Sequence, residues 1–325
     1  MKLNITSINT VLFIKVDELK TLNPSDTLFV LGNGFDLMHG VLSRYTDFRD
    51  SMSPHSQLRE ILEMYIASPM LWKDFEESLA HINAMAIHES ANAFLDIFDA
   101  YDEDAQAADF FAAIDAASTP IHIIENELPT KFRKWVNSLR LPSDKKVLEG
   151  IIKSNSKFLV FNYTEFIQTL YGAMKENVCY IHGCRKNVNE NLILGHPPDW
   201  QSKEDFIEYL PPENVTNLQM NYDAWQHVSY QLSDYNASTE KNTSNIIKSN
   251  KEFFISLSEI KNVVIIGHSL SKVDYAYFCQ IKICNSYPSN INWYISYHSN
   301  DDLHRIRDFV KCMDLYSNNI VLFKI

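Results

Sequence analysis

Thr27-Leu-Phe-Val-Leu-Gly-Asn-Gly-Phe-Asp36 is the stretch of sequence that decides the fold. A short apolar run leads into a turn with two glycines, Gly32 and Gly34, after which a helix is expected to begin. Nucleotide-binding units open in this way, because glycine lets the backbone approach a phosphate and a helix N-terminus supplies unpaired N–H groups. The third glycine of the dinucleotide motif is missing, so a plain tight turn remains the alternative.

The same pattern of an apolar run that ends in polar side chains returns three times. The segments are Lys157–Phe161 before Asn162, Val178–Ile181 before His182, and Asn262–Gly267 before His268 and Ser269. Open α/β sheets bind ligands at the carboxyl ends of their strands, so Asn162 and His182 are candidate site residues. Each has a structural alternative, because Asn162 or Thr164 can cap a helix and a strand-end histidine is often only packed.

Segments with helical spacing separate these runs, which predicts an α/β fold with a Rossmann-like, mostly parallel sheet. Near the C-terminus we expect an alternating strand, a helix and an edge strand, at Asn292–His298, Asp301–Met313 and Ile320–Phe323. The aromatic residues after Asp274 are expected to pack in the core.

Glycine usage indicates the domain organisation. No glycine lies between Gly40 and Gly150, and apolar residues in this region recur at helical spacing. We expect residues 1–50 to form the first part of the α/β domain, residues 51–150 a helical insertion or lid, and residues 151–325 the remainder. A second insertion is expected near 201–250, with a surface loop at Ser233–Ser244.

Composition is typical of a globular cytoplasmic protein. Of the 325 residues, 46 % are hydrophobic and 22 % are charged. No apolar run is long enough to cross a membrane, and the N-terminus lacks a basic region followed by an apolar core. The five cysteines are odd in number and scattered, as in proteins of reducing compartments.

The net charge of −12 is unevenly spread along the chain. From Asp74 to Thr130 there is no Lys or Arg, whereas Asp and Glu recur. Such a segment has no counter-charge for phosphates, so we expect no nucleic acid binding through this helical insertion. A solvated acidic face explains the charge, and a docking surface for a basic partner is the alternative.

Several motifs resemble, in order, those of the AbiH (abortive infection) family of bacterial antiphage proteins. They are Leu31-Gly-Asn-Gly-Phe-Asp-Leu-Met-His-Gly40 followed by Tyr45 and Phe48, Trp72-Lys-Asp-Phe-Glu76, Phe161-Asn-Tyr-Thr164, Ile181-His-Gly183 and Gly267-His-Ser-Leu-x-x-x-Asp274. The resemblance implies an antiphage effector that responds to a phage or host protein and that can form homo-oligomers.

The same order of motifs is similar, more distantly, to the sirtuin-like NAD-binding fold. The chain departs from sirtuins because Asn33 replaces an alanine, Phe35-Asp36 follows the turn, and no four-cysteine zinc ribbon follows His182. This resemblance implies Asn162 and His182 as catalytic residues. The cofactor-binding residues that it implies are Gly32, Asn33, Gly34, Phe35, Asp36, Gly267, His268, Ser269 and Asp274.

Cleavage of a nicotinamide–ribose bond gives these residues defined roles. Asn162 would hold ribose hydroxyls or the attacking water, and His182 would accept a proton. Gly32 and Gly34 would let the backbone approach the pyrophosphate. Asp36 or Asp274 would bind ribose hydroxyls.

The leading hypothesis is therefore an antiphage enzyme that hydrolyses NAD⁺ or a related nucleotide, without a metal. A second hypothesis is a metal-dependent phosphoesterase or nuclease in which His39, His182, His196 and His268 converge on a divalent ion. Carboxylate-rich metal motifs are missing from the sequence, which speaks against it. A third hypothesis is a non-catalytic nucleotide sensor.

Overall fold

The computed structural model describes residues 11–97, 107–197 and 218–325. The chain forms two compact units. Unit 1 consists of Met1–Arg44, Val136–Ile193 and Asn242–Ile325, and unit 2 consists of Tyr45–Trp135 and Leu194–Lys241. Unit 2 takes in much of both expected insertions.

Unit 1 contains a seven-stranded sheet in which every pair of neighbouring strands is parallel. The strands are β1 (Leu12–Ile14), β2 (Thr27–Leu31), β3 (Lys157–Val160), β4 (Val178–Tyr180), β5 (Asn262–Ile266), β6 (Asn292–Tyr297) and β7 (Ile320–Lys324). Their spatial order is β1-β7-β6-β5-β2-β3-β4. Apart from β1, this is the order of the doubly wound dinucleotide-binding fold, so the expected Rossmann-like α/β class is confirmed.

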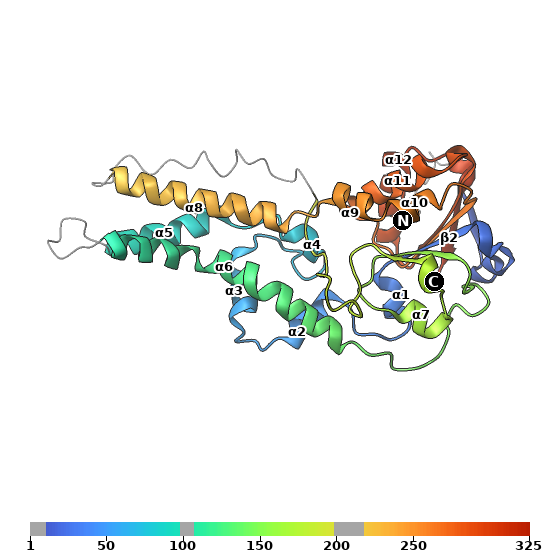
Figure 1. Cartoon of the computed structure of the whole chain (residues 1–325), viewed down its shortest axis with the longest axis horizontal. Coiled ribbons are helices and arrows are strands. Elements are labelled where there is room, and N and C mark those ends of the chain that lie inside the picture. The colour runs from blue at the N-terminus through green and yellow to red at the C-terminus, as the bar shows by residue number, and fades with distance from the viewer. Residues whose placement is uncertain (1–10, 98–106, 198–217) are drawn as a thin grey trace. The chain divides into compact units, whose positions relative to one another are not determined.

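Helices cover both faces of this sheet, with α10–α12 on one side and α1 and α7 on the other (Figure 1). The helices of unit 1 are α1 (Asn33–Met38), α7 (Phe166–Tyr171), α9 (Thr243–Ser249), α10 (Lys251–Ile255), α11 (Tyr275–Cys284) and α12 (Asn300–Cys312). Strands β2 and β5 are buried along their whole length, as expected of central strands in a parallel sheet. Alternate residues of the strands pack with Phe254, Phe278 and Phe309 of the covering helices in one apolar core.

The edge of the sheet differs from the prediction. Ile320–Phe323 was expected to be an edge strand, but β7 lies between β6 and β1, and β1 is the outer strand. Leu12 and Phe13 of β1 are more than half exposed, so the short segment has no alternation of buried and exposed residues by which it is recognised.

Unit 2 is helical. Its helices are α2 (Tyr45–Ser51), α3 (Gln57–Tyr65), α4 (Phe75–Ser78), α5 (Ala84–Ile97), α6 (Ala107–Ser138, whose last three residues belong to unit 1) and α8 (Leu218–Thr239). Helices α5 and α8 pack side by side (Figure 1). The rings of Phe48, Phe75 and Phe132 form an aromatic core that joins α2, α4 and α6.

The prediction of a surface loop at Ser233–Ser244 is wrong, because within this range only Glu240–Asn242 lies outside helices. Residues up to Thr239 continue α8, and Asn242 caps α9 by accepting a hydrogen bond from the Asn245 N–H. Polar composition suggested a loop, but Tyr235 is fully buried and donates to the Leu79 carbonyl oxygen at 2.9 Å. Packing against the rest of unit 2 therefore overrides local composition.

A buried ion pair links the two chain segments that form unit 2. Lys241, whose side chain is fully buried, pairs with Glu76, and the Tyr45 hydroxyl donates to the other Glu76 oxygen at 2.7 Å. Tyr45 and Glu76 both belong to motifs that carry the family resemblance. These two contacts lie within unit 2, so the motif residues help to hold the helical unit together.

The acidic segment is helical where it is described, and its expected lack of nucleic acid binding stays a prediction. From Asp74 to Thr130 the described residues lie in unit 2 and are mainly helical, whereas the acidic run Asp102–Asp104 lies outside the described residues. Throughout the described ranges, no helix is both long enough and apolar enough to span a membrane.

Candidate functional site

Four neighbouring strands of unit 1 bring polar side chains to one edge of the sheet. Strands β3 and β4 lie on one side of β2, and β5 lies on the other, so the strand order reverses between β2 and β5. The carboxyl ends of strands beside such a reversal form the usual ligand crevice of open α/β sheets. The predicted site residues in the loops after β2, β3, β4 and β5 therefore lie at the usual position of a ligand site in this kind of sheet.

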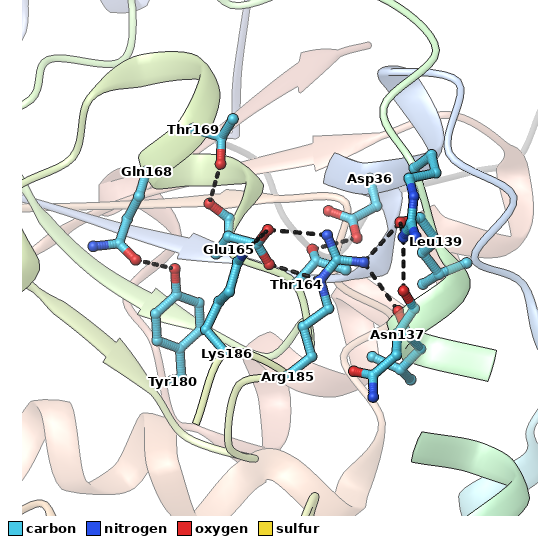
Figure 2. A network of polar contacts seen from close by, with 12 residues as sticks. Asp36, Asn137, Leu139, Thr164, Glu165, Gln168, Thr169, Tyr180, Arg185 and Lys186 are labelled. Carbon is cyan, nitrogen blue, oxygen red and sulfur yellow. Dashed lines mark hydrogen bonds and ion pairs between the residues drawn. The ribbon is translucent and has the colours of Figure 1, made fainter. Parts of the chain in front are cut away.

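Asp36 and Asn162 are brought together from different strand ends. Asn162 Nδ2 donates to Asp36 Oδ1, and the Thr164 hydroxyl donates to Asp36 Oδ2, both at 2.7 Å (Figure 2 shows Asp36 and Thr164). Burial raises the pKa of Asp36 to about 6, although the hydrogen bonds from Thr164 and Asn162 oppose the rise. Asp36, which was expected to bind ribose, is thus held by neighbouring protein groups.

The bond to Asp36 fixes the orientation of the Asn162 amide. Because the carboxylate takes the amide N–H, the oxygen is left to face a hydrogen-bond donor. Asn162 is 5 % exposed, and its Oδ1 accepts no hydrogen bond from the described residues. A buried amide oxygen without a donor is costly, at roughly 1–3 kcal/mol, so this atom is well placed to accept from a ligand or water.

Arg185 and Glu165, which the sequence analysis did not single out, form an ion pair close enough to Asp36 to affect its pKa (Figure 2). Arg185 holds both carboxylate oxygens of Glu165, with Nε to Oε2 at 2.7 Å and Nη2 to Oε1 at 2.9 Å. Its Nη1 donates to the carbonyl oxygens of Val136 and Leu139, at the C-terminal end of α6. Burial is the largest single influence and raises the pKa of Glu165. The hydrogen bonds from Arg185 and from the Glu165 backbone, together with the charges of Arg185 and Lys186, outweigh it and keep this pKa below its usual value.

The position of this ion pair in the sequence offered a weak signal. Glu165 directly follows the Asn-Tyr-Thr segment, and Arg185 follows His182 by three residues. Both therefore belong to loops that were already identified, but their pairing depends on how β3 and β4 align.

A second cluster combines His182, His268 and Asp274. His182 Nε2 lies 3.6 Å from Asp274 Oδ1, and His268 Nε2 lies 3.4 Å from Asp274 Oδ2. All three side chains are less than a tenth exposed. The ring of Phe161 meets both imidazoles edge to face, with centroids 5.2 Å from His182 and 4.3 Å from His268. Two imidazoles thus share one carboxylate in an aromatic setting.

The glycines of the first turn are needed for packing between two loops. A Cβ on Gly32 would lie 2.5 Å from His268 Cα, and a Cβ on Gly34 would lie 2.5 Å from Gly267 Cα. Gly267 has φ of 61°, a conformation that favours glycine. The loops after β2 and β5 therefore approach closely because all three residues lack a side chain.

The N–H groups of this turn are largely used within the protein. Gly32 donates to the Ile266 carbonyl oxygen, Gly34 to that of Gly267, and Phe35 to that of Gly32, at 2.8 to 3.0 Å. Contact between this turn and a pyrophosphate stays a prediction, and these three N–H groups would have to exchange partners to make it.

The side chains of Asn33 and Phe35, two other predicted cofactor-binding residues, make contacts elsewhere in unit 1. The side chains of Asn33 and Ser43 hydrogen-bond to each other, and Asn33 Nδ2 also donates to the Ser43 carbonyl oxygen. Phe35 is buried against His39 and Tyr171. Ser269 is exposed. Their packing gives Asn33 and Phe35 structural roles.

The four histidines of the phosphoesterase hypothesis do not share one environment. His39 donates from Nδ1 to the Phe35 carbonyl oxygen and accepts from the Tyr171 hydroxyl at Nε2. His196 belongs to unit 2, where its nitrogens face the carbonyl oxygens of Pro197 and Asn236 at 2.8 and 3.1 Å. In the part of the chain that the structure describes, no group of three or more His, Cys, Asp or Glu is arranged to hold a metal ion.

Fold and site together define a Rossmann-like α/β protein with an Asp–Asn pair and a His–Asp–His cluster at the carboxyl edge of its sheet. The model of the family described as "Bacteriophage abortive infection AbiH" matches residues 28–297. The chain therefore belongs to the AbiH family, whose description points to antiphage abortive infection. Searches of curated proteins and of solved structures gave no match.

Proposed function

We propose that this AbiH protein exerts its antiphage effect by hydrolysing NAD⁺ or a related nucleotide at the carboxyl edge of the sheet. The strand order is that of dinucleotide-binding folds, and the candidate residues follow the strands beside the reversal point. The similarity of the sequence motifs to sirtuin-like proteins suggests NAD⁺ as the first substrate to test.

Hydrolysis needs a held ribose, a base and a water molecule. Water adds to C1′ of the nicotinamide ribose while the bond from C1′ to the nicotinamide nitrogen breaks. Nicotinamide leaves as a neutral molecule with both electrons of that bond, and the proton of the water passes to His182 and then to solvent. Asn162 accepts a hydrogen bond from a ribose hydroxyl or from the water, which orients the reacting groups.

The observation that carries the proposal is the buried Asn162 amide. Asp36 fixes the amide N–H, and the oxygen accepts no hydrogen bond from the described residues. A purely structural asparagine would be expected to have both ends of its amide satisfied. His182 supplies the base from the end of β4, and β3 and β4 are neighbours in the sheet.

The test compares His182→Ala with His298→Ala, in which an exposed histidine beyond the end of β6 is removed. Release of nicotinamide from NAD⁺, phage plating efficiency and thermal stability are measured for both variants. Loss of a general base lowers rates by roughly 10²–10⁴-fold, so we expect His182→Ala to lose turnover and phage protection while His298→Ala keeps both.

Two outcomes count against the proposal. If His182→Ala folds normally and retains both turnover and protection, His182 is a packed strand-end residue. If the parent protein protects cells but cleaves neither NAD⁺ nor other nucleotides, with or without Mg²⁺ or Mn²⁺, the site does not act as a nucleotide hydrolase.

A further inference from the structure

Asp274 occupies a helix-capping position without capping the helix. It immediately precedes α11, where an aspartate normally accepts a hydrogen bond from the first turn, but its side chain makes no such bond. The carboxylate instead faces His182 and His268. The usual structural role of an N-terminal aspartate therefore does not explain its orientation.

The orientation of His268 is set by the backbone next to it. Leu270 adopts φ of 53°, a left-handed conformation that is uncommon for leucine, and its N–H donates to His268 Nδ1 at 2.9 Å. Because Nδ1 accepts this bond, the neutral ring carries its proton on Nε2, the atom that lies 3.4 Å from Asp274 Oδ2. Backbone strain at Leu270 thus helps to direct an N–H towards the carboxylate.

His182 faces the other carboxylate oxygen. Its Nε2 lies 3.6 Å from Asp274 Oδ1, which is longer than a hydrogen bond but within reach after a small shift. The Phe161 and Tyr277 rings pack against the imidazole, with centroids at 5.2 and 5.8 Å. Packing and charge therefore both restrict the orientation of this ring.

We infer that Asp274 is a positioning residue for His182, and that His268 anchors Asp274, so that neither acts by binding the cofactor. The chain of contacts runs from the Leu270 N–H through His268 and Asp274 to His182. With Nε2 of His182 turned to the carboxylate, Nδ1 is the nitrogen that takes the proton. This inference rests on the proposed role of His182 as general base.

Two measurements test the inference separately from the substrate. The first is ¹⁵N NMR of histidine-labelled protein without ligand, for the parent, Asp274→Asn and the exposed-residue control Asp301→Asn. We expect the parent His268 to show an unprotonated Nδ1 and a protonated Nε2. Asp274→Asn should shift the imidazole resonances of both histidines, while Asp301→Asn should leave them unchanged.

The second measurement is steady-state NAD⁺ hydrolysis. Loss of an orienting carboxylate is expected to lower kcat by roughly 10²–10⁴-fold, with KM within a few-fold of the parent. His268→Gln, which retains an amide donor, should keep more turnover than His268→Leu. A structural role alone would not produce this difference between two equally folded variants.

Either measurement can overturn the inference. If Asp274→Asn raises KM and leaves kcat unchanged, Asp274 binds substrate. If it leaves both imidazole spectra unchanged, the carboxylate does not position the rings, whatever the substrate is. If the spectra change as expected but the parent protein does not cleave NAD⁺, the positioning contacts stand and the proposed function fails.

Discussion

Replacement of Asp36 by Asn measures the free-energy cost of burying the Asp36 carboxylate at the candidate site. Asp36 is 2 % exposed, and its carboxyl accepts hydrogen bonds from Asn162 and Thr164. Asparagine has the same shape without the charge. Its oxygen can accept from Asn162, and its amide can donate to the Thr164 hydroxyl after that hydroxyl rotates, so both contacts survive in neutral form.

The magnitude follows from the pKa of Asp36, which burial raises from 3.8 to about 6. A raised pKa in a folded acid means that the native state binds more protons than the unfolded state between these two values. The contribution of Asp36 to the free energy of unfolding is therefore fully present below pH 3.8. It is lost as the pH rises towards 6 and stays lost above that pH. The difference in pKa corresponds to about 3 kcal/mol at pH 7.

The pKa of about 6 already includes the hydrogen bonds from Thr164 and Asn162, so asparagine is expected to remove the whole of this cost. We expect Asp36→Asn to be more stable than the parent by about 3 kcal/mol at pH 7 and of similar stability near pH 4, where the Asp36 carboxyl of the folded parent is protonated. Urea unfolding followed by far-UV circular dichroism at several pH values measures this difference.

Because the two proteins are compared at each pH, the contributions of the titratable groups that they share cancel from the difference in stability. One of these is His88 in unit 2, whose pKa burial lowers to about 4 and whose contribution has the opposite dependence on pH. Asp301→Asn, which removes an exposed carboxylate, is the matched control. If the difference in free energy of unfolding between Asp36→Asn and the parent stayed constant from pH 4 to pH 7, the argument that burial raises the pKa of Asp36 would be refuted.

Two further predictions concern folding. Gly34→Ala and Gly267→Ala should each destabilise unit 1 by several kcal/mol in thermal or urea unfolding, because the new Cβ meets backbone atoms within about 2.6 Å, whereas Gly172→Ala, with φ of 65° and no atom within 4 Å, should cost only about 1 kcal/mol. Equal losses for the three variants would contradict the packing role of the first two glycines. Lys241→Met should lower the free energy of unfolding of unit 2 by roughly 3–5 kcal/mol because it removes the buried cation that pairs with Glu76, and the added Glu76→Leu change should recover most of that loss. A single Lys241→Met variant as stable as the parent would show that the pair is not needed.

The sequence predicts the central strands well because each carries its own signal. β2, β3 and β5 are nearly continuous apolar runs that end in glycine or polar residues, and such runs in an α/β chain become buried parallel strands. β1 carries no such signal, because it is three residues long, largely exposed, and stabilised by pairing with β7 at the other end of the chain.

The candidate site is predictable in its location but not in its pairing. Asn162, His182 and His268 follow strands, so their approach to one edge follows from parallel topology. Which side chains meet depends on the register and on loop conformation. Asp36 and Asn162 are 126 positions apart, and the contact of Asp274 with two histidines depends on a left-handed Leu270 that no local pattern indicates.

The glycine turn shows in the same way that a sequence does not identify which groups meet. Gly32 and Gly34 identify a place where the backbone approaches another group, and a phosphate was the natural candidate. The structure supplies the backbone of Gly267 and His268 as that group. A glycine indicates close approach, but the sequence does not say whether the partner is a ligand or a second loop.

The Asp36 carboxylate is buried at an electrostatic cost, and this cost bears on the role of the neighbouring Asn162. Arg185 lies close enough to lower the pKa of Asp36, but its Glu165 partner acts in the opposite direction, so burial remains the largest influence. A carboxylate that costs the fold about 3 kcal/mol at neutral pH is not explained by stability, because a neutral side chain of the same shape would keep both contacts. What only the carboxylate provides is an acceptor that cannot donate, and this fixes the Asn162 amide with its oxygen available to a ligand. The hydrogen bond from the Asn162 amide to this carboxylate is therefore a physical reason, independent of sequence resemblance, to test the Asn162 oxygen as a ligand contact.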